Sequence, residues 1–128
     1  MNFLIIDDDY YKVSQFTRYL NKSEDTFTVK GSYNSGLREL FFNEDIKYDC
    51  IILDMNFPTF DNEGVEINEG LSVLRELDRK KINIPVVIYS SKYVDISKYE
   101  NVIDYILYEG YDLMKRVKAI KNKLKGDF

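Results

Sequence analysis

Acidic residues follow two of the most apolar runs in this sequence. The run Cys-Ile-Ile-Leu ends at Asp54, and another apolar run near the start of the chain ends at the triplet Asp7, Asp8 and Asp9. Carboxylates that meet at one place repel one another, which raises at least one pKa unless a cation lies between them. Mg²⁺ suits such a place, because it takes oxygen ligands and keeps waters that a phosphate can displace. The pattern predicts an acidic Mg²⁺ site if the two runs are neighbours.

Other kinds of chemistry find little support in the composition. The chain has no histidine, which excludes His-based zinc sites, Ser/His triads and phosphohistidine on this chain. Its one cysteine, Cys50, forms no internal disulfide and fits a reducing cytoplasm. The net charge of −4 argues against general nucleic-acid or membrane binding, and the sequence shows neither a membrane-spanning run nor a signal peptide. We expect a cytoplasmic protein that binds no nucleic acid and no membrane.

The elements that must position the acids alternate along the chain. Buried or edge strands are predicted at about residues 2–7, 26–32, 50–54, 85–90 and 102–107. Helices are predicted at about residues 9–22, 35–43, 69–81 and 111–125, with only a short helical piece at 96–100. This alternation predicts an α/β fold: a parallel sheet of five strands in the order 2-1-3-4-5, doubly wound and flavodoxin-like, with the fourth helix shortened. Strands one and three are then neighbours, so Asp7, Asp8 and Asp54 meet at the carboxyl edge, where such sheets bind ligands.

With these acids in this strand order, the chain resembles a response-regulator receiver domain. The likeness covers residues 1–128 as a single receiver-like domain, and its motifs are Leu4-Ile5-Ile6-Asp7-Asp8-Asp9, Ile52-Leu53-Asp54-Met55-Asn56-Phe57-Pro58, Val86-Val87-Ile88-Tyr89-Ser90-Ser91 and Asp104-Tyr105-Ile106-Leu107.

The resemblance implies a role for each of these positions. Asp54 would be the phosphoryl acceptor, and Asp8 and Asp54 would hold Mg²⁺ directly, together with the backbone carbonyl of Asn56. Asp7 would act through a water on the metal. Ser90 would donate a hydrogen bond to the phosphoryl group, and Tyr105 would be the switch aromatic.

The chain departs from the family pattern near the predicted site. The family has a lysine and a proline after its fifth strand, where this chain has Tyr108 and Glu109. Tyr108 is uncharged at neutral pH, so we expect slow or weak phosphorylation, with Lys92 as another cation to test. The family glycine that follows the acceptor by about eight residues is matched by Gly70, sixteen residues after Asp54. The intervening residues 59–70 are acidic, without a base, and fit equally a solvated loop and a lid or partner contact.

Two functions from different classes follow. In the first, the chain is a stand-alone phosphorylation switch of a two-component system or phosphorelay, with no enzymatic activity beyond self-phosphorylation and self-dephosphorylation. A sensor histidine kinase or a phosphotransfer protein would supply the phosphoryl group, and output would pass to another protein. In the second, the chain is a pseudo-receiver that binds proteins without phosphorylation. A flavodoxin-like nucleotide or flavin binder ranks last, because no glycine-rich phosphate loop follows the first strand.

Overall fold

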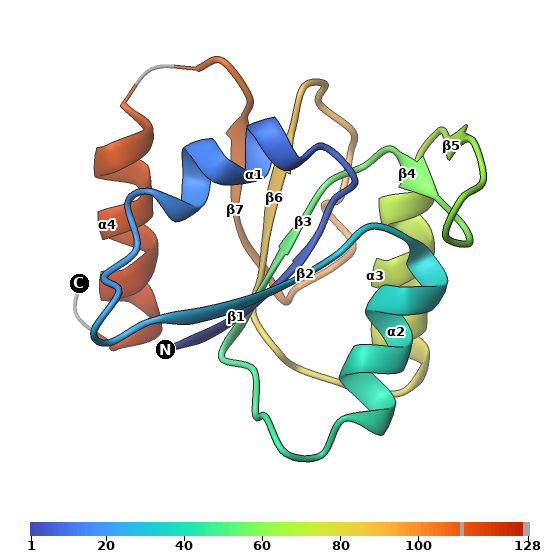
Figure 1. The fold of residues 1–128 in the computed structure, drawn as a ribbon, viewed down its shortest axis with the longest axis horizontal. Coiled ribbons are helices and arrows are strands. Elements are labelled where there is room, and N and C mark those ends of the chain that lie inside the picture. Colours follow the sequence, from blue (N-terminus) through green and yellow to red (C-terminus); the bar gives the residue numbers. More distant parts are fainter. Residues whose placement is uncertain (111, 127–128) are drawn as a thin grey trace.

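A parallel sheet forms the centre of the computed structural model, which describes residues 1–110 and 112–126. Its strands stand in the order β2-β1-β3-β6-β7, as Figure 1 shows. They are β2 (Thr26–Lys30), β1 (Asn2–Ile6), β3 (Cys50–Leu53), β6 (Val86–Ser90) and β7 (Val102–Leu107). Numbered along the sheet-forming strands alone, this is the predicted order 2-1-3-4-5, so the predicted doubly wound, flavodoxin-like architecture is confirmed.

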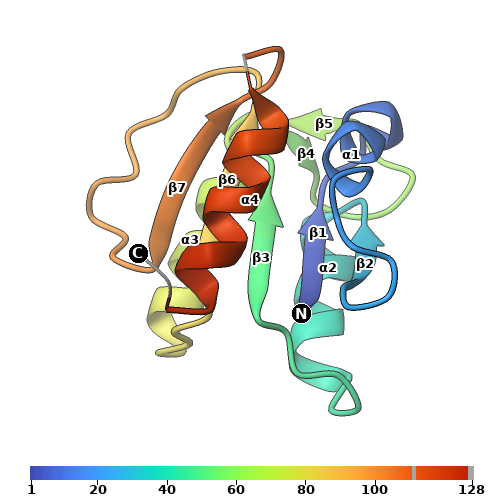
Figure 2. The same cartoon turned by 90° about the vertical axis from the view of Figure 1, so that its left-hand side faces the viewer.

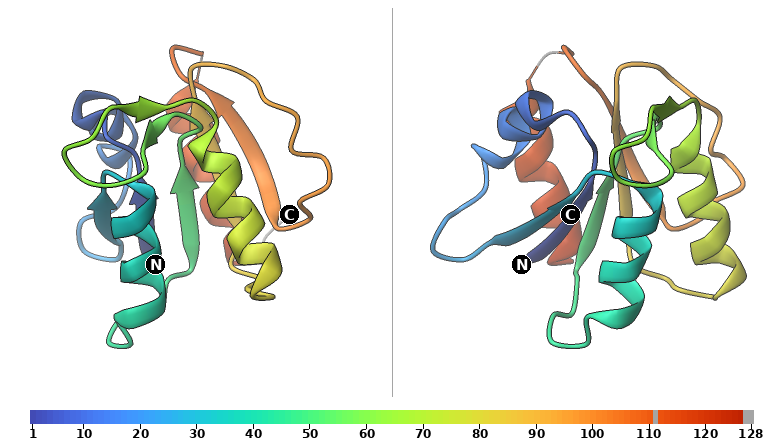
Figure 3. Two further views of the ribbon diagram at one scale, coloured as in Figure 1. Left: turned by 90° about the vertical axis from the view of Figure 1, so that its right-hand side faces the viewer. Right: turned by 45° about the vertical axis from the view of Figure 1, so that its right-hand side comes forward.

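Helices cover both faces of the sheet. They are α1 (Tyr10–Thr17), α2 (Tyr33–Phe42), α3 (Glu69–Arg79) and α4 (Leu113–Leu124). Figure 2 shows α4 in front of one face, and the left panel of Figure 3 shows α2 and α3 side by side on the opposite face. Each face has its own core: Phe16 of α1 and Ile120 of α4 pack on one side, and Leu74 and Leu77 of α3 pack on the other. Within the described residues, no helix is long and apolar enough to cross a membrane.

The first and last helices are shorter than predicted. Helix α1 ends at Thr17 rather than near residue 22, and turns continue from there. Its N-cap is Asp9, whose side chain accepts a hydrogen bond from the backbone N–H of Lys12. One oxygen of Asp9 therefore serves the helix cap, and the backbone N–H of Asp9 donates to Asp7 Oδ1 at 2.9 Å. Residue 111, where we expected the last helix to begin, lies outside the described residues.

The connection between β6 and β7 is a loop in place of a helix. We predicted a shortened helix with one helical piece near residues 96–100, and the structure has turns there. Their hydrogen bonds run from Tyr99 N–H to Ile96 O (2.9 Å) and from Val102 N–H to Tyr99 O (3.2 Å). The fourth helix is therefore reduced to turns in this chain.

The acidic segment after Asp54 has more structure than we predicted. Two short strands, β4 (Phe57–Pro58) and β5 (Val65–Glu66), pair antiparallel and form a hairpin. Phe57 anchors the hairpin, because its side chain is fully buried in the core beside α2 and α3. The expectation of a loop without regular structure over residues 59–70 was wrong at Val65–Glu66, which form β5 and pair with β4 just before the loop. Strands this short carry too few residues for their alternation to be recognised in a sequence.

Candidate functional site

The predicted acids lie at the same level on neighbouring strands. Ile6 of β1 and Leu53 of β3 are paired in register, so Asp7 and Asp54 are the next residues along each strand. The backbone N–H of Asp54 continues the ladder and donates to Ile6 O at 3.1 Å. The carboxyl ends of these strands point to one edge of the sheet, at the top of Figure 2.

The carboxylates of Asp7, Asp8 and Asp54 form one cluster. Each offers an oxygen atom, and these oxygens all lie within 4.8 Å of one another. Asp7 and Asp54 are buried, with 2% and 8% of their surface exposed, whereas Asp8 is half-buried. An all-oxygen donor set with one accessible member is the kind of site that Mg²⁺ uses. The convergence that we predicted from the strand order is therefore present.

Burial and mutual repulsion change the acidity of this cluster. Burial raises the pKa of Asp7 to about 6; the charge of Lys12 opposes the rise and that of Asp54 adds to it. Burial also raises the pKa of Asp8, and the charges of Asp54 and Asp9 add to that rise. Carboxylates with raised pKa values gain most when a cation is brought among them.

A lysine that was not predicted from the sequence lies in this cluster. The Lys12 ammonium lies 2.7 Å from Asp7 Oδ2 and 3.0 Å from Asp54 Oδ1, and its side chain is 5% exposed. Two aromatic rings flank it, with the ring centre of Tyr89 at 5.2 Å and that of Tyr108 at 6.0 Å. A signal for this residue was available. Lys12 is four positions before Phe16, on the face of α1 that points inward, and a lysine there must find buried partners.

Two serines, Ser90 at the end of β6 and Ser91 just past it, carry hydroxyl groups at the carboxyl edge of the sheet. Ser90 is fully buried, and its Oγ has no hydrogen-bond partner among the described residues. Ser91 lines a cavity of about 530 Å³ above the acids, together with Asp8, Lys12, Asp54, Asn56 and Tyr108. An unpaired buried hydroxyl is costly, so it needs an explanation such as a group that binds there.

The predicted switch aromatic, Tyr105, faces the loop that replaces the fourth helix. Its hydroxyl donates to Lys92 O at 2.6 Å and accepts from the backbone N–H of Val94 at 2.9 Å. Its ring also contacts that of Tyr93, with centroids 5.0 Å apart. Tyr105 therefore links the edge strand β7 to the loop that follows Ser90. The side chain of Lys92 itself is exposed.

The hairpin after Asp54 is fixed by a close backbone contact. The backbone N–H of Gly70, at the start of α3, donates to Met55 O at 2.9 Å. A Cβ atom on Gly70 would overlap Asp54 O and Met55 Cε. Asn56 fastens the other side of the hairpin, because its Oδ1 accepts from Asn68 N–H at 2.8 Å. Only glycine fits at position 70, which supports its match to the family glycine.

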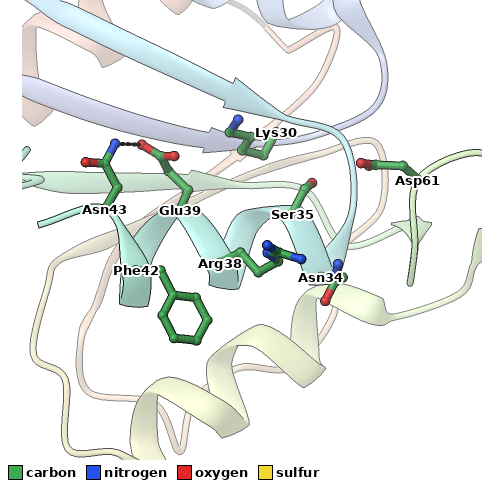
Figure 4. Close-up of a pocket in the computed structure, with 8 residues that line it drawn as sticks. All are labelled: Lys30, Asn34, Ser35, Arg38, Glu39, Phe42, Asn43 and Asp61. Atoms are coloured by element: carbon green, nitrogen blue, oxygen red, sulfur yellow. Dashed lines mark hydrogen bonds between the residues drawn. The ribbon is translucent and has the colours of Figure 1, made fainter.

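A second hollow, of about 460 Å³, lies beside α2. Figure 4 shows Lys30, Arg38 and Glu39 on its walls, with Asp61 reaching in from the hairpin. Asp61 also lines the neighbouring hollow that contains Asp8. The hairpin thus brings Asp61 near the acidic edge of the sheet.

The one cysteine of the chain, Cys50, is buried and chemically inert. Burial raises the pKa of the Cys50 thiol to about 12, so it stays protonated at neutral pH.

This fold and this acidic edge are those of receiver domains, and the sequence agrees. The sequence model of the response regulator receiver domain matches residues 3–109, and the chain belongs to that family. Receiver domains are signalling domains of two-component systems. They are generally non-enzymatic, bind Mg²⁺ in an acidic pocket, and interact with histidine kinases or phosphotransfer proteins and with downstream effectors.

Solved structures share the fold at low sequence identity. The receiver domain of the Francisella response regulator 1452 is 22% identical, with a TM-score of 0.72, and the match covers 98% of this chain and 97% of that one. A CheY-like receiver domain protein from Methanospirillum hungatei is 18% identical, with a TM-score of 0.70 and coverage of 98% and 94%. The Thermotoga maritima response regulator TrrA, solved in complex with Mg²⁺–BeF, is 19% identical, with a TM-score of 0.68 and coverage of 96% and 97%. Among curated proteins, no sequence matches this chain.

Proposed function

We propose that this chain accepts a phosphoryl group on Asp54 in a Mg²⁺-dependent switch of a two-component system or phosphorelay. The observation that carries the proposal is the meeting of three carboxylates within 4.8 Å at the ends of β1 and β3. The cavity above them is large enough for a phosphoryl group, at about 530 Å³. Residues 1–128 would act as one receiver domain.

The donor atoms at this edge suit Mg²⁺. Asp8 and Asp54 would hold the ion with the backbone carbonyl of Asn56, and Asp7 would act through a water. Asp8 is the most accessible of the three acids and forms no ion pair with the described residues. The ion would offset the negative charge that the acids and an incoming phosphoryl group bring together.

In the transfer step, a carboxylate oxygen of Asp54 attacks the phosphorus of the donor. Where the donor is a phosphohistidine, the P–N bond breaks, its electron pair stays on the imidazole nitrogen, and a mixed anhydride forms on Asp54. Oδ1 of Asp54 already accepts a hydrogen bond from the Met55 N–H at 2.8 Å and contacts Lys12. Oδ2 accepts no hydrogen bond from the described residues, so it is the freer oxygen for attack. The unpaired Ser90 hydroxyl would donate to the transferred group.

The effect of the added charge would be transmitted to the surface through β6 and β7. A phosphoryl group carries about −1.5 to −2 charge at neutral pH, in place of the single charge of a carboxylate. Tyr105 would report this change, because its hydroxyl binds both Lys92 O and Val94 N–H in the loop that follows Ser90. A sensor histidine kinase or phosphotransfer protein would be the donor, and another protein would read the altered face.

A pseudo-receiver that works without phosphorylation is the second candidate. The specific observation in its favour is the ion pair of Lys12 with Asp7 and Asp54, which offsets part of the acidic charge without a metal. The absence of a lysine at position 108 points the same way.

One measurement separates the two functions. The purified chain is incubated with acetyl phosphate, with and without Mg²⁺, and its intact mass is followed over time. We expect Mg²⁺-dependent addition of one phosphoryl group, and Asp54→Ala should abolish it. A parent protein whose mass never changes, even at high donor and Mg²⁺ concentration, would leave the pseudo-receiver as the function.

A further inference from the structure

We propose that the Lys12 ammonium binds the oxygens of the phosphoryl group once that group is on Asp54. Lys12 is then a positioning residue on α1, and it supplies the positive charge that position 108 lacks. This inference rests on the proposed function and names a further residue of the same site. It starts from the position of the ammonium group. Lys12 Nζ is already within hydrogen-bond distance of Asp54, at 3.0 Å from Oδ1, and Lys12 lines the cavity into which a group on Asp54 would extend.

The position of Lys12 is fixed from both ends of its side chain. Its backbone N–H donates to Asp9 Oδ1 at 3.1 Å in the first turn of α1, so the helix N-cap sets where the side chain begins. At the other end, Asp7 Oδ2 holds the ammonium at 2.7 Å. A lysine has a flexible four-carbon stem with three donors. The Lys12 ammonium can therefore stay bound to Asp7 and at the same time donate to the oxygens of a group added to Asp54.

The Lys12 ammonium offsets part of the negative charge of the site. Asp7, Asp8 and Asp54 carry three negative charges when ionised, and Lys12 carries one positive charge. Phosphorylation adds about 0.5 to 1 further negative charge to Asp54. Among the described residues, Lys12 is the one cationic side chain in an ion pair with any of these acids. A buried ammonium is tolerated only when it is paired in this way, so the site and the lysine depend on each other.

Tyr108 occupies the other side of the same ammonium. Its ring centre lies 6.0 Å from Lys12 Nζ, and its ring packs edge-on against Tyr89 at 5.8 Å. The aromatic face attracts the lysine without competing for the acids. A second ammonium at position 108 would repel that of Lys12, whereas an uncharged ring fits beside it. Lys12 and Tyr108 therefore form one matched arrangement.

The test uses Lys12→Met, which keeps an unbranched apolar side chain as far as Cε but removes the charged ammonium. We expect Mg²⁺-dependent phosphorylation by acetyl phosphate to slow about 100-fold, by analogy with the loss of one donor to a developing anion. Lys12→Arg should keep part of the rate, and Tyr108→Lys added to Lys12→Met should restore much of it. Lys118→Met is the matched control: it removes an exposed lysine of α4 and should leave the rate unchanged.

Mg²⁺ binding is measured by calorimetry without any phosphodonor. In Lys12→Met the affinity for Mg²⁺ should rise, whereas the phosphorylation rate should fall. Removing the ammonium removes a like charge from the metal's surroundings, so Lys12→Met should bind Mg²⁺ about fivefold more tightly or better. A variant that binds Mg²⁺ more tightly and yet accepts phosphate more slowly cannot be explained by a collapsed site.

Each of the other outcomes overturns either the role of Lys12 or the proposed function. If the parent is phosphorylated and Lys12→Met keeps its rate, the role of Lys12 is wrong while the proposed function stands. If Lys12→Met loses both Mg²⁺ binding and phosphorylation, and Tyr108→Lys restores neither, Lys12 only holds the site together and the inference is again wrong. If the parent itself accepts no phosphate under any condition, the proposed function fails first and the inference falls with it.

Discussion

Gly70→Ala tests how closely the helix α3 supports the acceptor. Gly70 is the second residue of α3 and is buried against the peptide that joins Asp54 to Met55. A Cβ at this position would overlap Asp54 O and Met55 Cε and would lie 2.9 Å from Met55 Cα. Two of these atoms belong to the backbone just past β3, so rotation of a side chain cannot relieve the contact. Either α3 or the Asp54–Met55 peptide must move.

The magnitude follows from two opposing effects. Alanine is favoured over glycine in a helix by about 1 kcal/mol. Overpacking a rigid site costs about 1–3 kcal/mol, and a clash with backbone belongs at the upper end of that range. We expect Gly70→Ala to lower the free energy of unfolding by about 2 kcal/mol, measured by urea denaturation. Because the shift moves the carboxylate of Asp54, the stabilisation by Mg²⁺ should shrink in the same variant.

Two other glycines serve as controls. Gly64 lies in the exposed part of the hairpin, and a Cβ there would meet no atom within 4 Å, so Gly64→Ala should change stability by less than about 0.5 kcal/mol. Gly36 of α2 is intermediate, because its Cβ would lie 2.7 Å from Ile6 Cδ1, a side-chain atom. Should Gly70→Ala prove as stable and as responsive to Mg²⁺ as Gly64→Ala, the close contact that we describe would be refuted.

Further predictions concern charge. Millimolar Mg²⁺ should raise the melting temperature of the parent, and Asp8→Ala should abolish that rise. Asp7 has a pKa raised to about 6, above its unfolded value, so the folded state binds the proton more tightly. Stability without metal should therefore fall as pH rises from about 4 to about 6, a slope that Asp7→Asn removes, and Mg²⁺ should stabilise the protein at pH 7.5 but little at pH 5. Asp25 is buried and pairs with the N-terminal amine and with a lysine of α4 at 2.6 Å, so Asp25→Asn should cost about 2–3 kcal/mol in urea denaturation. The double variant Asp61→Asn/Glu63→Gln should accept acetyl phosphate faster than the parent at low salt and equally fast at high salt; equal rates at both would show that the hairpin acids do not influence the donor.

The sequence was sufficient for the sheet but not for the connections. The apolar runs of β1, β3 and β6 are buried on both faces, so their composition alone identifies them as inner strands, and the acid after each of the first two marks the edge. The hairpin of β4 and β5 depends on contacts with the core and with α3, which a local pattern does not record. The loss of the helix before β7 was predictable only from the small number of residues between β6 and β7.

For the site, acids were predictable and their counter-charge was not. Asp7, Asp8 and Asp54 are found from strand ends, because a strand end fixes where the next side chain lies. Lys12 belongs to a helix, and its ammonium reaches the acids through a long stem whose direction depends on the cap at Asp9 and on the rings beside it. An inward-facing lysine in a helix signals a buried partner, but the sequence does not say which one.

Lys12 also changes what should be expected of position 108. From the sequence alone, Tyr108→Lys supplies a missing charge and should raise phosphorylation. In the structure an ammonium already contacts Asp54, and the ring of Tyr108 lies against it. A second ammonium would meet the first at short range, and like charges near one another are unfavourable. Tyr108→Lys in the parent should therefore raise the phosphorylation rate little or lower it, while the same substitution helps when Lys12 is Met. The opposite pattern, a large gain in the parent and none in Lys12→Met, would mean that the site lacks a cation despite Lys12.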